Sequence, residues 1–171
     1  RRREEGRALS RVGLAAYVAY DGRKSIEAYE AALAIHEEIA DDGAQAATLQ
    51  RLGWYRRWTG GRRAALHCYR RAFPLFTQSH DLQGEISLLT DSSMASLELG
   101  DMAAASAGLE RALALADPVR DVERLPSLCS ALAIVQLRGG EIAKGIETAR
   151  RGIDLALQTR NKRAEAALQN T

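Results

Sequence analysis

The stretch that decides the fold is residues 49–75, LQRLGWYRRWTGGRRAALHCYRRAFPL. It predicts a helix, a turn at Gly60 and Gly61 and a second helix, because glycine commonly ends a helix and both flanks carry apolar residues at helical spacing. Within it lie the small residues Gly53, Ala65 and Ala72. Similar residues recur 40 positions earlier and later, so the stretch is one copy of a repeated unit.

Two columns of small residues carry the repeat. In the predicted first helix of each unit the column is Gly13, Gly53, Ser93 and Ala133. In the predicted second helix it is Ala32, Ala72, Ala112 and Gly152. Apolar anchors keep the same step, at Leu9, Leu49, Leu89 and Cys129 and at Leu33, Phe73, Leu113 and Ile153. A fixed period of this length indicates stacked helix pairs in which small residues let neighbouring helices approach closely.

The motif within one unit has a known counterpart. Leu52 and Gly53, followed by Gly60 and then by Ala65, Tyr69 and Ala72, resemble the tetratricopeptide repeat (TPR). The later units match less well: the third has Ser92 and Ser93 in place of Leu-Gly, and the fourth has Gly145 and Ala149 at the small and aromatic positions. The period also exceeds the roughly 34 residues of the standard repeat. HEAT-like units of roughly 40 to 47 residues are the alternative, which the Leu-Gly and Ala-xxx-Tyr spacing disfavours.

The resemblance implies an all-α fold, a right-handed superhelix of antiparallel helix pairs with four repeats plus a partial fifth, of the 40-residue extended type found in bacterial regulatory proteins. We expect one TPR-like array over residues 1–171, with repeats at about 1–42, 43–80, 81–120 and 121–160. Residues 163–169, RAEAALQ, echo residues 43–49, GAQAATL. Residues 161–171 are therefore expected to begin a truncated fifth repeat or to form a capping helix, and the chain is interpreted as a fragment of a longer protein.

Helix ends are expected at glycine, aspartate and proline. The first unit is predicted as helices over 5–20 and 24–40, with Gly43 as the left-handed terminus and the arginines at positions 1–3 as a frayed end. In the fourth unit, Pro118 and Pro126 are expected to delay the first helix until residue 128. Its second helix is predicted over 142–159.

Composition and cysteine usage indicate the class of protein. Apolar residues make up 46% of the chain, but no apolar run reaches the length of a membrane span and no signal segment opens the sequence. Cys68 and Cys129 show neither metal-site nor disulfide spacing. We therefore expect a soluble, cytoplasmic protein with two buried cysteines.

Charge is nearly balanced overall but unevenly distributed. The formal net charge is +2. Residues 43–80 contain seven arginines and no acidic residue, whereas residues 81–120 are acidic, so these neighbours are expected to attract each other. Interleaved aromatics such as Trp54 and Trp58 make single-stranded nucleic acid one alternative ligand of the second repeat. The low net charge disfavours it, and a solvated helix face or an acidic partner are the other interpretations.

In the TPR family the first helix of each pair lines a concave groove. The resemblance implies inward positions that also include Val18, Thr90 and Ser130. The candidate partner-binding residues are Leu14, Tyr17, Gln50, Trp54, Arg57, Trp58, Met94, Leu97, Ile134 and Leu137. Such a lining suits an amphipathic helix or an extended apolar segment of a protein or peptide. In the alternative interpretation, these side chains pack on one another and fill the groove.

The sequence predicts no enzyme, because reactive groups do not converge in any known pattern. His36, His67 and His80 are scattered, and neither a zinc motif nor a phosphate loop is present. We expect no catalytic residue, no metal and no cofactor. The functional hypothesis is a protein-interaction or regulatory module of a larger bacterial regulator, with transcriptional control as one such role. The alternative is a free-standing scaffold or adaptor. The sequence leaves the oligomeric state open, and self-pairing through residues 166–168 would be an artefact of a truncated fifth unit.

Overall fold

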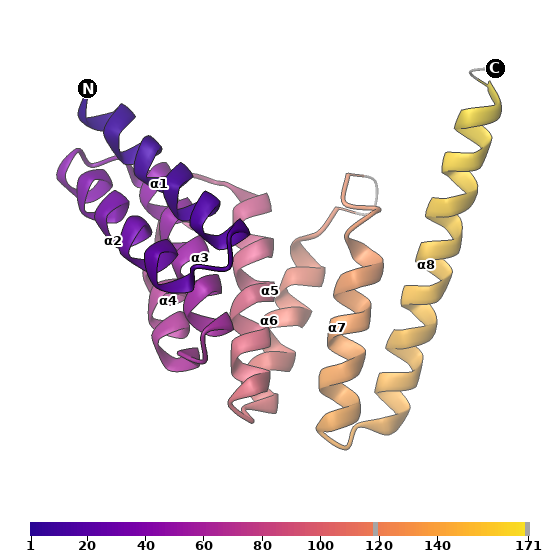
Figure 1. The fold of residues 1–171 in the computed structure, drawn as a ribbon. Coiled ribbons are helices and arrows are strands. Elements are labelled where there is room, and N and C mark those ends of the chain that lie inside the picture. Colours follow the sequence, from indigo (N-terminus) through magenta and orange to yellow (C-terminus); the bar gives the residue numbers. More distant parts are fainter. Residues whose placement is uncertain (118–119, 170–171) are drawn as a thin grey trace.

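The chain folds into a row of α-helices. The computed structural model describes residues 1–117 and 120–169, and the side chains of this range up to residue 160. Within these residues eight helices form: α1 (Arg2–Val18), α2 (Gly22–Glu38), α3 (Asp42–Trp58), α4 (Arg62–Gln78), α5 (Leu82–Glu98), α6 (Met102–Leu115), α7 (Leu125–Arg138) and α8 (Ile142–Gln169). Each odd-numbered helix packs most closely on the next even one. Successive pairs follow one another along a curved array (Figure 1). The predicted architecture of stacked antiparallel helix pairs is confirmed.

The same type of turn follows six of the described helices and sets the spacing between successive helices. Its middle residue has a positive φ in every case, at Tyr20, Ala40, Gly60, His80, Gly100 and Gly140. At the first turn, the amide of Tyr20 donates to the carbonyl of Tyr17, and the amide of Asp21 donates to the carbonyl of Ala16. This pair of bonds is the Schellman motif, which satisfies carbonyls left without partners at a helix end. Each turn therefore closes one helix and reverses the chain.

An aspartate begins the helix after four of these turns. The side chains of Asp21, Asp41, Asp81 and Asp101 each accept a hydrogen bond from the amide three residues later. Such capping satisfies one of the free amides at a helix start. Gly43, predicted to be the left-handed terminus, lies inside α3 instead, because Ala40 takes the left-handed conformation and Asp41 caps the helix.

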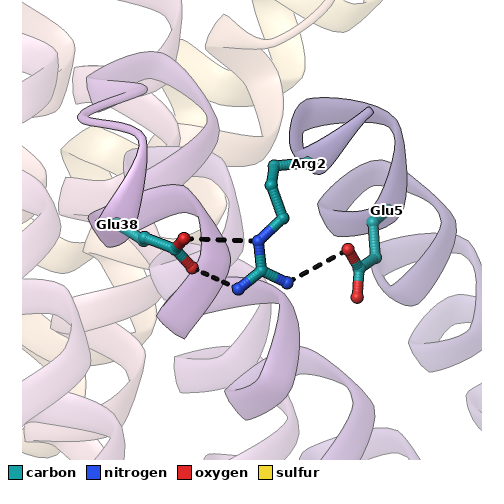
Figure 2. Close-up of polar contacts among 3 residues, drawn as sticks. All are labelled: Arg2, Glu5 and Glu38. Atoms are coloured by element: carbon teal, nitrogen blue, oxygen red, sulfur yellow. Dashed lines mark hydrogen bonds and ion pairs between the residues drawn. The ribbon is translucent and has the colours of Figure 1, made fainter.

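Two of the three arginines at the N-terminus, Arg2 and Arg3, form ion pairs and lie in a helix, so the predicted frayed end is wrong for them. Arg2 lies between two glutamates, with its Nη2 2.6 Å from Glu38 Oε2 and its Nη1 3.1 Å from Glu5 Oε2 (Figure 2). Arg3 Nε lies 3.1 Å from Asp41 Oδ2. These contacts hold the first turn of α1 against the end of α2, and α1 accordingly begins three residues earlier than predicted.

Glycine allows the two helices of a pair to approach closely. A Cβ atom at Gly13 would lie 2.7 Å from the ring of Tyr29, and one at Gly53 would lie 2.5 Å from the ring of Tyr69. Both tyrosines are almost completely buried. In the third repeat the glycine lies on the second helix of the pair instead of the first, and Gly108 of α6 faces Ser93 of α5. The predicted small-residue column at Gly13, Gly53 and Ser93 therefore lies at the contact between paired helices.

Two hydrophobic clusters form the core. One joins the first two pairs and reaches α5 through Leu88 and Ala95. The other joins the last two pairs. Phe73 of α4 packs against both clusters and links them. Cys68 and Cys129 are buried and free, as the sequence predicted.

The C-terminal part differs from the prediction in two places. α7 begins at Leu125 rather than residue 128, because Pro126 occupies the first turn, where a helix needs no amide donor. Pro118 lies outside the described residues. α8 continues without a break to Gln169, so the predicted helix end near residue 159 is wrong. The assignment of residues 161–171 to a fifth repeat stays a prediction. None of the helices that the structure describes is both long and apolar enough to cross a membrane.

Candidate binding groove

The first helices of all four pairs line one groove. Its volume is about 650 Å³. The lining residues come from α1, α3, α5 and α7: Leu14, Tyr17, Ala47, Gln50, Arg51, Trp54, Tyr55, Ser87, Thr90, Asp91, Arg124, Ser127 and Leu128. Side chains in a helix that are three or four residues apart share a face, and the lining residues of α3 and α5 follow this spacing. The groove therefore runs across the array, with each pair contributing one helix face.

Aromatic rings form one wall of the groove. The ring centroid of Tyr17 lies 5.0 Å from that of Trp54 in an edge-to-face arrangement, and 4.9 Å from that of Tyr55. Tyr55 in turn stacks on Tyr29 in the core, with centroids 5.3 Å apart. Arrangements of this kind stabilise aromatic pairs beyond the area they bury. The wall is therefore continuous with the core and holds Trp54 in place before any ligand binds.

A carboxylate, that of Asp91, also lines the groove. Asp91 Oδ2 accepts a hydrogen bond from Gln50 Nε2 at 2.9 Å, which joins α5 to α3. Burial raises the pKa of Asp91, while the bond from Gln50 and the charge of Arg57 act in the opposite direction. No ion pair joins Asp91 to a cation within the described residues, so its charge is matched mainly by a neutral amide. A cationic ligand group would therefore find a partly desolvated carboxylate.

Comparison with known proteins supports the fold. No family model matches the sequence, and no curated protein matches it either. Among solved structures, BtubC (BKLC) from P. vanneervenii superposes with a TM-score of 0.85 at 19% identity, over 91% of this chain and 64% of that one. A putative kinesin light chain from Podosopora anserina with nearly identical TPR-like repeats gives a TM-score of 0.79 at 14% identity, over 91% of this chain and 76% of that one.

A third similar structure is much longer. Aspartyl phosphate phosphatase F from Bacillus subtilis gives a TM-score of 0.84 at 14% identity, over 93% of this chain and 42% of that one. The chain thus spans less than two thirds of both BtubC and this phosphatase. The fold is that of a TPR-like α-solenoid. At these identities the likeness concerns the fold alone.

The TPR-like groove includes some of the predicted site residues but not all. Leu14, Tyr17, Gln50 and Trp54 line it together. Arg57 is largely covered and pairs with Glu98, and Leu97 is only 5% exposed and belongs to the core, so Leu97 is not available to a partner. The other predicted residues lie outside the groove lining: Met94 packs against the core, while Trp58, Ile134 and Leu137 are exposed.

Sequence reasoning missed residues one helical turn closer to the N-termini of the first helices. Ala47, Ser87 and Ser127 lie 40 residues apart and hold equivalent positions in successive repeats, and so do Arg51 and Asp91. The prediction instead included Arg57 and Leu97, which lie later in the same helices and are taken up by packing. A signal was present, since the polar column of Gln50 and Thr90 lies between the missed ones.

Most of the arginine block in the second repeat forms ion pairs with neighbouring repeats. Arg56 pairs with Glu30, and Arg71 pairs with Glu37, both in the first repeat. Arg57 and Arg62 both pair with Glu98 of the third repeat. The attraction expected between basic and acidic repeats is therefore present as specific contacts. Arg56 and Arg57 are largely covered, whereas Arg62 and Arg71 remain exposed to solvent, and the four pairs reduce the positive charge available to nucleic acid.

Proposed function

We propose that this chain is a protein-interaction module of 40-residue TPR-like repeats, and that it binds a segment of a partner protein in the groove lined by α1, α3, α5 and α7. One observation carries the proposal: a preformed groove of about 650 Å³ combines an aromatic wall with a carboxylate that forms no ion pair among the described residues. Binding grooves of this kind are mostly apolar, with a few polar groups that fix orientation.

The lining suggests the chemistry of the segment. Leu14 and Trp54 suit an apolar side chain, because burying an aromatic surface is a common source of binding energy at interfaces. Asp91 suits a lysine or arginine side chain beside it. Ser87, Thr90 and Ser127 offer hydroxyl oxygens that can accept hydrogen bonds from the backbone amides of the segment, since the Thr90 and Ser127 hydroxyls already donate to the carbonyls of Ile86 and Arg124. The proposed ligand is therefore a peptide that carries an apolar and a basic residue.

We also propose that the module belongs to a larger bacterial regulator. The similarity to a longer bacterial protein whose name includes phosphatase activity supports this reading. A free-standing scaffold or adaptor is the alternative, and the full-length reading frame distinguishes the two. A nucleotide-binding or helix-turn-helix segment in the same frame supports the regulator, and a stop codon close to residue 171 contradicts it.

A peptide library displayed on phage tests the groove. Peptides selected on the immobilised protein are measured against the wild type and the variants Trp54→Ala and Asp91→Asn. We expect Trp54→Ala to weaken binding by roughly 30-fold, as expected for an interface residue worth about 2 kcal/mol. Asp91→Asn should weaken the binding of basic peptides by about tenfold.

Leu82→Ala is the control, because Leu82 is an apolar residue at the start of α5 that lies outside the groove lining and is 52% exposed. It should retain most of the affinity. Circular dichroism establishes that each variant keeps its helices. If folded Trp54→Ala and Asp91→Asn proteins bind the selected peptides as tightly as the wild type does, the groove is not the binding site.

A further inference from the structure

A second crevice lies beside the groove, between the first two repeats. Its volume is about 240 Å³. The lining residues come from α1, α2 and α3: Arg7, Ser10, Arg11, His36, Ala44, Ala47, Thr48 and Arg51. Ala47 and Arg51 line both the crevice and the groove. A ligand in the groove therefore extends directly toward the crevice.

Positive charge gathers in this crevice, and Asp41, whose charge acts on His36, is already paired with Arg3. Three arginines line it, Arg7, Arg11 and Arg51, and its lining contains no carboxylate. None of the three forms an ion pair within the part of the chain that the structure describes, although Arg2, Arg3 and most arginines of α3 and α4 do. Like charges held close together repel one another, so an anion between them would be stabilised.

The crevice lining includes a buried histidine. His36 is only 1% exposed, and its Nδ1 atom has no hydrogen-bond partner among the described residues. The imidazole is held against α1, since a Cβ atom at Gly6 would lie 2.6 Å from Cε1 of His36. A buried polar atom without a partner is costly, and a ligand or an ion commonly explains one.

Comparison of the repeats shows that packing alone does not require these residues. The positions that correspond to His36 in the next two repeats are Phe76 and Ala116, which are buried apolar residues. The position of Arg7 is Ala47 in the second repeat and serine in the third and fourth. The first repeat therefore departs from the pattern of its neighbours by adding a histidine and an arginine at the same place.

We propose that the crevice between α1, α2 and α3 binds a phosphate group. Guanidinium groups present several N–H donors in a planar fork that matches the oxygens of phosphate. Three such groups balance a doubly charged phosphate better than a singly charged carboxylate. The phosphate belongs either to a free small molecule or to a phosphorylated residue of a segment in the adjoining groove.

Isothermal titration of inorganic phosphate at constant ionic strength tests this site. We expect saturable binding of one phosphate per chain. Arg7→Gln and Arg11→Gln should each weaken it by about tenfold, the usual effect of losing a charge-assisted hydrogen bond. Arg63→Gln is the control, because Arg63 is an exposed arginine of α4 that lines none of these cavities, and it should leave the affinity unchanged. Absence of saturation, or equal losses in all three variants, would overturn the proposal.

A second measurement separates the sources of the phosphate. A phosphoserine peptide selected for groove binding is titrated against the wild type and Trp54→Ala. If the phosphate is carried by a groove ligand, the peptide binds more tightly than inorganic phosphate. Trp54→Ala should then lower the affinity of the peptide to that of inorganic phosphate. If the ligand is a free phosphate compound, the two affinities are equal. In both cases Trp54→Ala leaves inorganic phosphate binding intact, so failure of the groove does not imply failure of the phosphate site.

Discussion

Gly53 of α3 lies so close to Tyr69 of α4 that a Cβ atom at Gly53 would be 2.5 Å from Cε1 of the ring. Tyr69 is 2% exposed, so its ring has no free space into which to move. We expect Gly53→Ala to lower the free energy of unfolding by about 1 to 3 kcal/mol, because overpacking outweighs the better helix propensity of alanine. Urea denaturation measures the change.

Gly43→Ala is the matched control for this substitution. Gly43 lies in the first turn of the same helix, and the nearest atom to a Cβ atom there would be Asp41 Oδ1 at 4.0 Å. We expect the free energy of unfolding to stay the same or to rise by up to about 1 kcal/mol. Equal effects of the two substitutions would contradict close packing at Gly53.

The turn after α2 contains an unfavourable residue. Ala40 has a φ of 49°, whereas Gly60 and Gly100 occupy the corresponding turns of later helices. A left-handed backbone costs roughly 1 kcal/mol for a residue with a Cβ atom. We therefore expect Ala40→Gly to raise the free energy of unfolding by about that amount, measured by thermal and urea denaturation.

Ala31→Gly provides the opposite case, because Ala31 is exposed in the middle of α2. There glycine should lower the free energy of unfolding by about 0.5 to 1 kcal/mol. Should Ala40→Gly also destabilise the protein, the left-handed conformation at residue 40 would be wrong.

Glu98 joins the second and third repeats through two arginines. Its Oε1 lies 3.1 Å from Arg57 Nη1, and its Oε2 lies 3.0 Å from Arg62 Nε. We expect Glu98→Gln to lower the free energy of unfolding by about 1 kcal/mol at low salt, and by less at high salt because ions screen exposed pairs. Denaturation at two salt concentrations measures both effects.

The control for Glu98 is a pair within one helix. Arg23 and Glu27 pair on the surface of α2, with side chains 90% and 61% exposed. Glu27→Gln should change the free energy of unfolding by no more than about 0.5 kcal/mol. An effect of Glu98→Gln as small as this would mean that the arginine block contributes little to the stacking of the repeats.

The repeat columns were predictable because they reflect short-range packing that is copied in each unit. Gly53 and Tyr69 appear in the sequence at the spacing that brings them together across one turn. The left-handed residues Tyr20, Ala40 and His80 were not predictable from composition, because none of them is glycine. Their conformation follows from the aspartate cap that comes next and from the packing of helices on both sides.

The candidate groove was only partly predictable, because its lining depends on how neighbouring helix pairs pack. Leu14, Gln50 and Trp54, which the pattern of first helices predicted to share a surface, line one groove in the structure. It did not show that Leu97 would be taken up by the core, because that depends on how the next pair packs. It also did not indicate the crevice at His36, since an isolated histidine carries no spacing signal and becomes informative only beside Arg7 and Arg11.

Burial of His36 should make stability depend on pH. Desolvation lowers its pKa from the ordinary value of 6.5, with Arg7 acting in the same direction and Asp41 opposing it. As the pH falls below 6.5, the unfolded chain binds a proton on this histidine before the folded chain does, so the free energy of unfolding decreases until the folded state is protonated as well. We expect a decrease on the order of 1 kcal/mol between pH 7.5 and pH 5.5 that is absent in His36→Gln. The exposed His67 is the control, and His67→Gln should keep the pH dependence of the wild type. Urea denaturation of the three proteins across this range measures the effect, and parallel curves for all three would show that His36 is not held in a desolvated site.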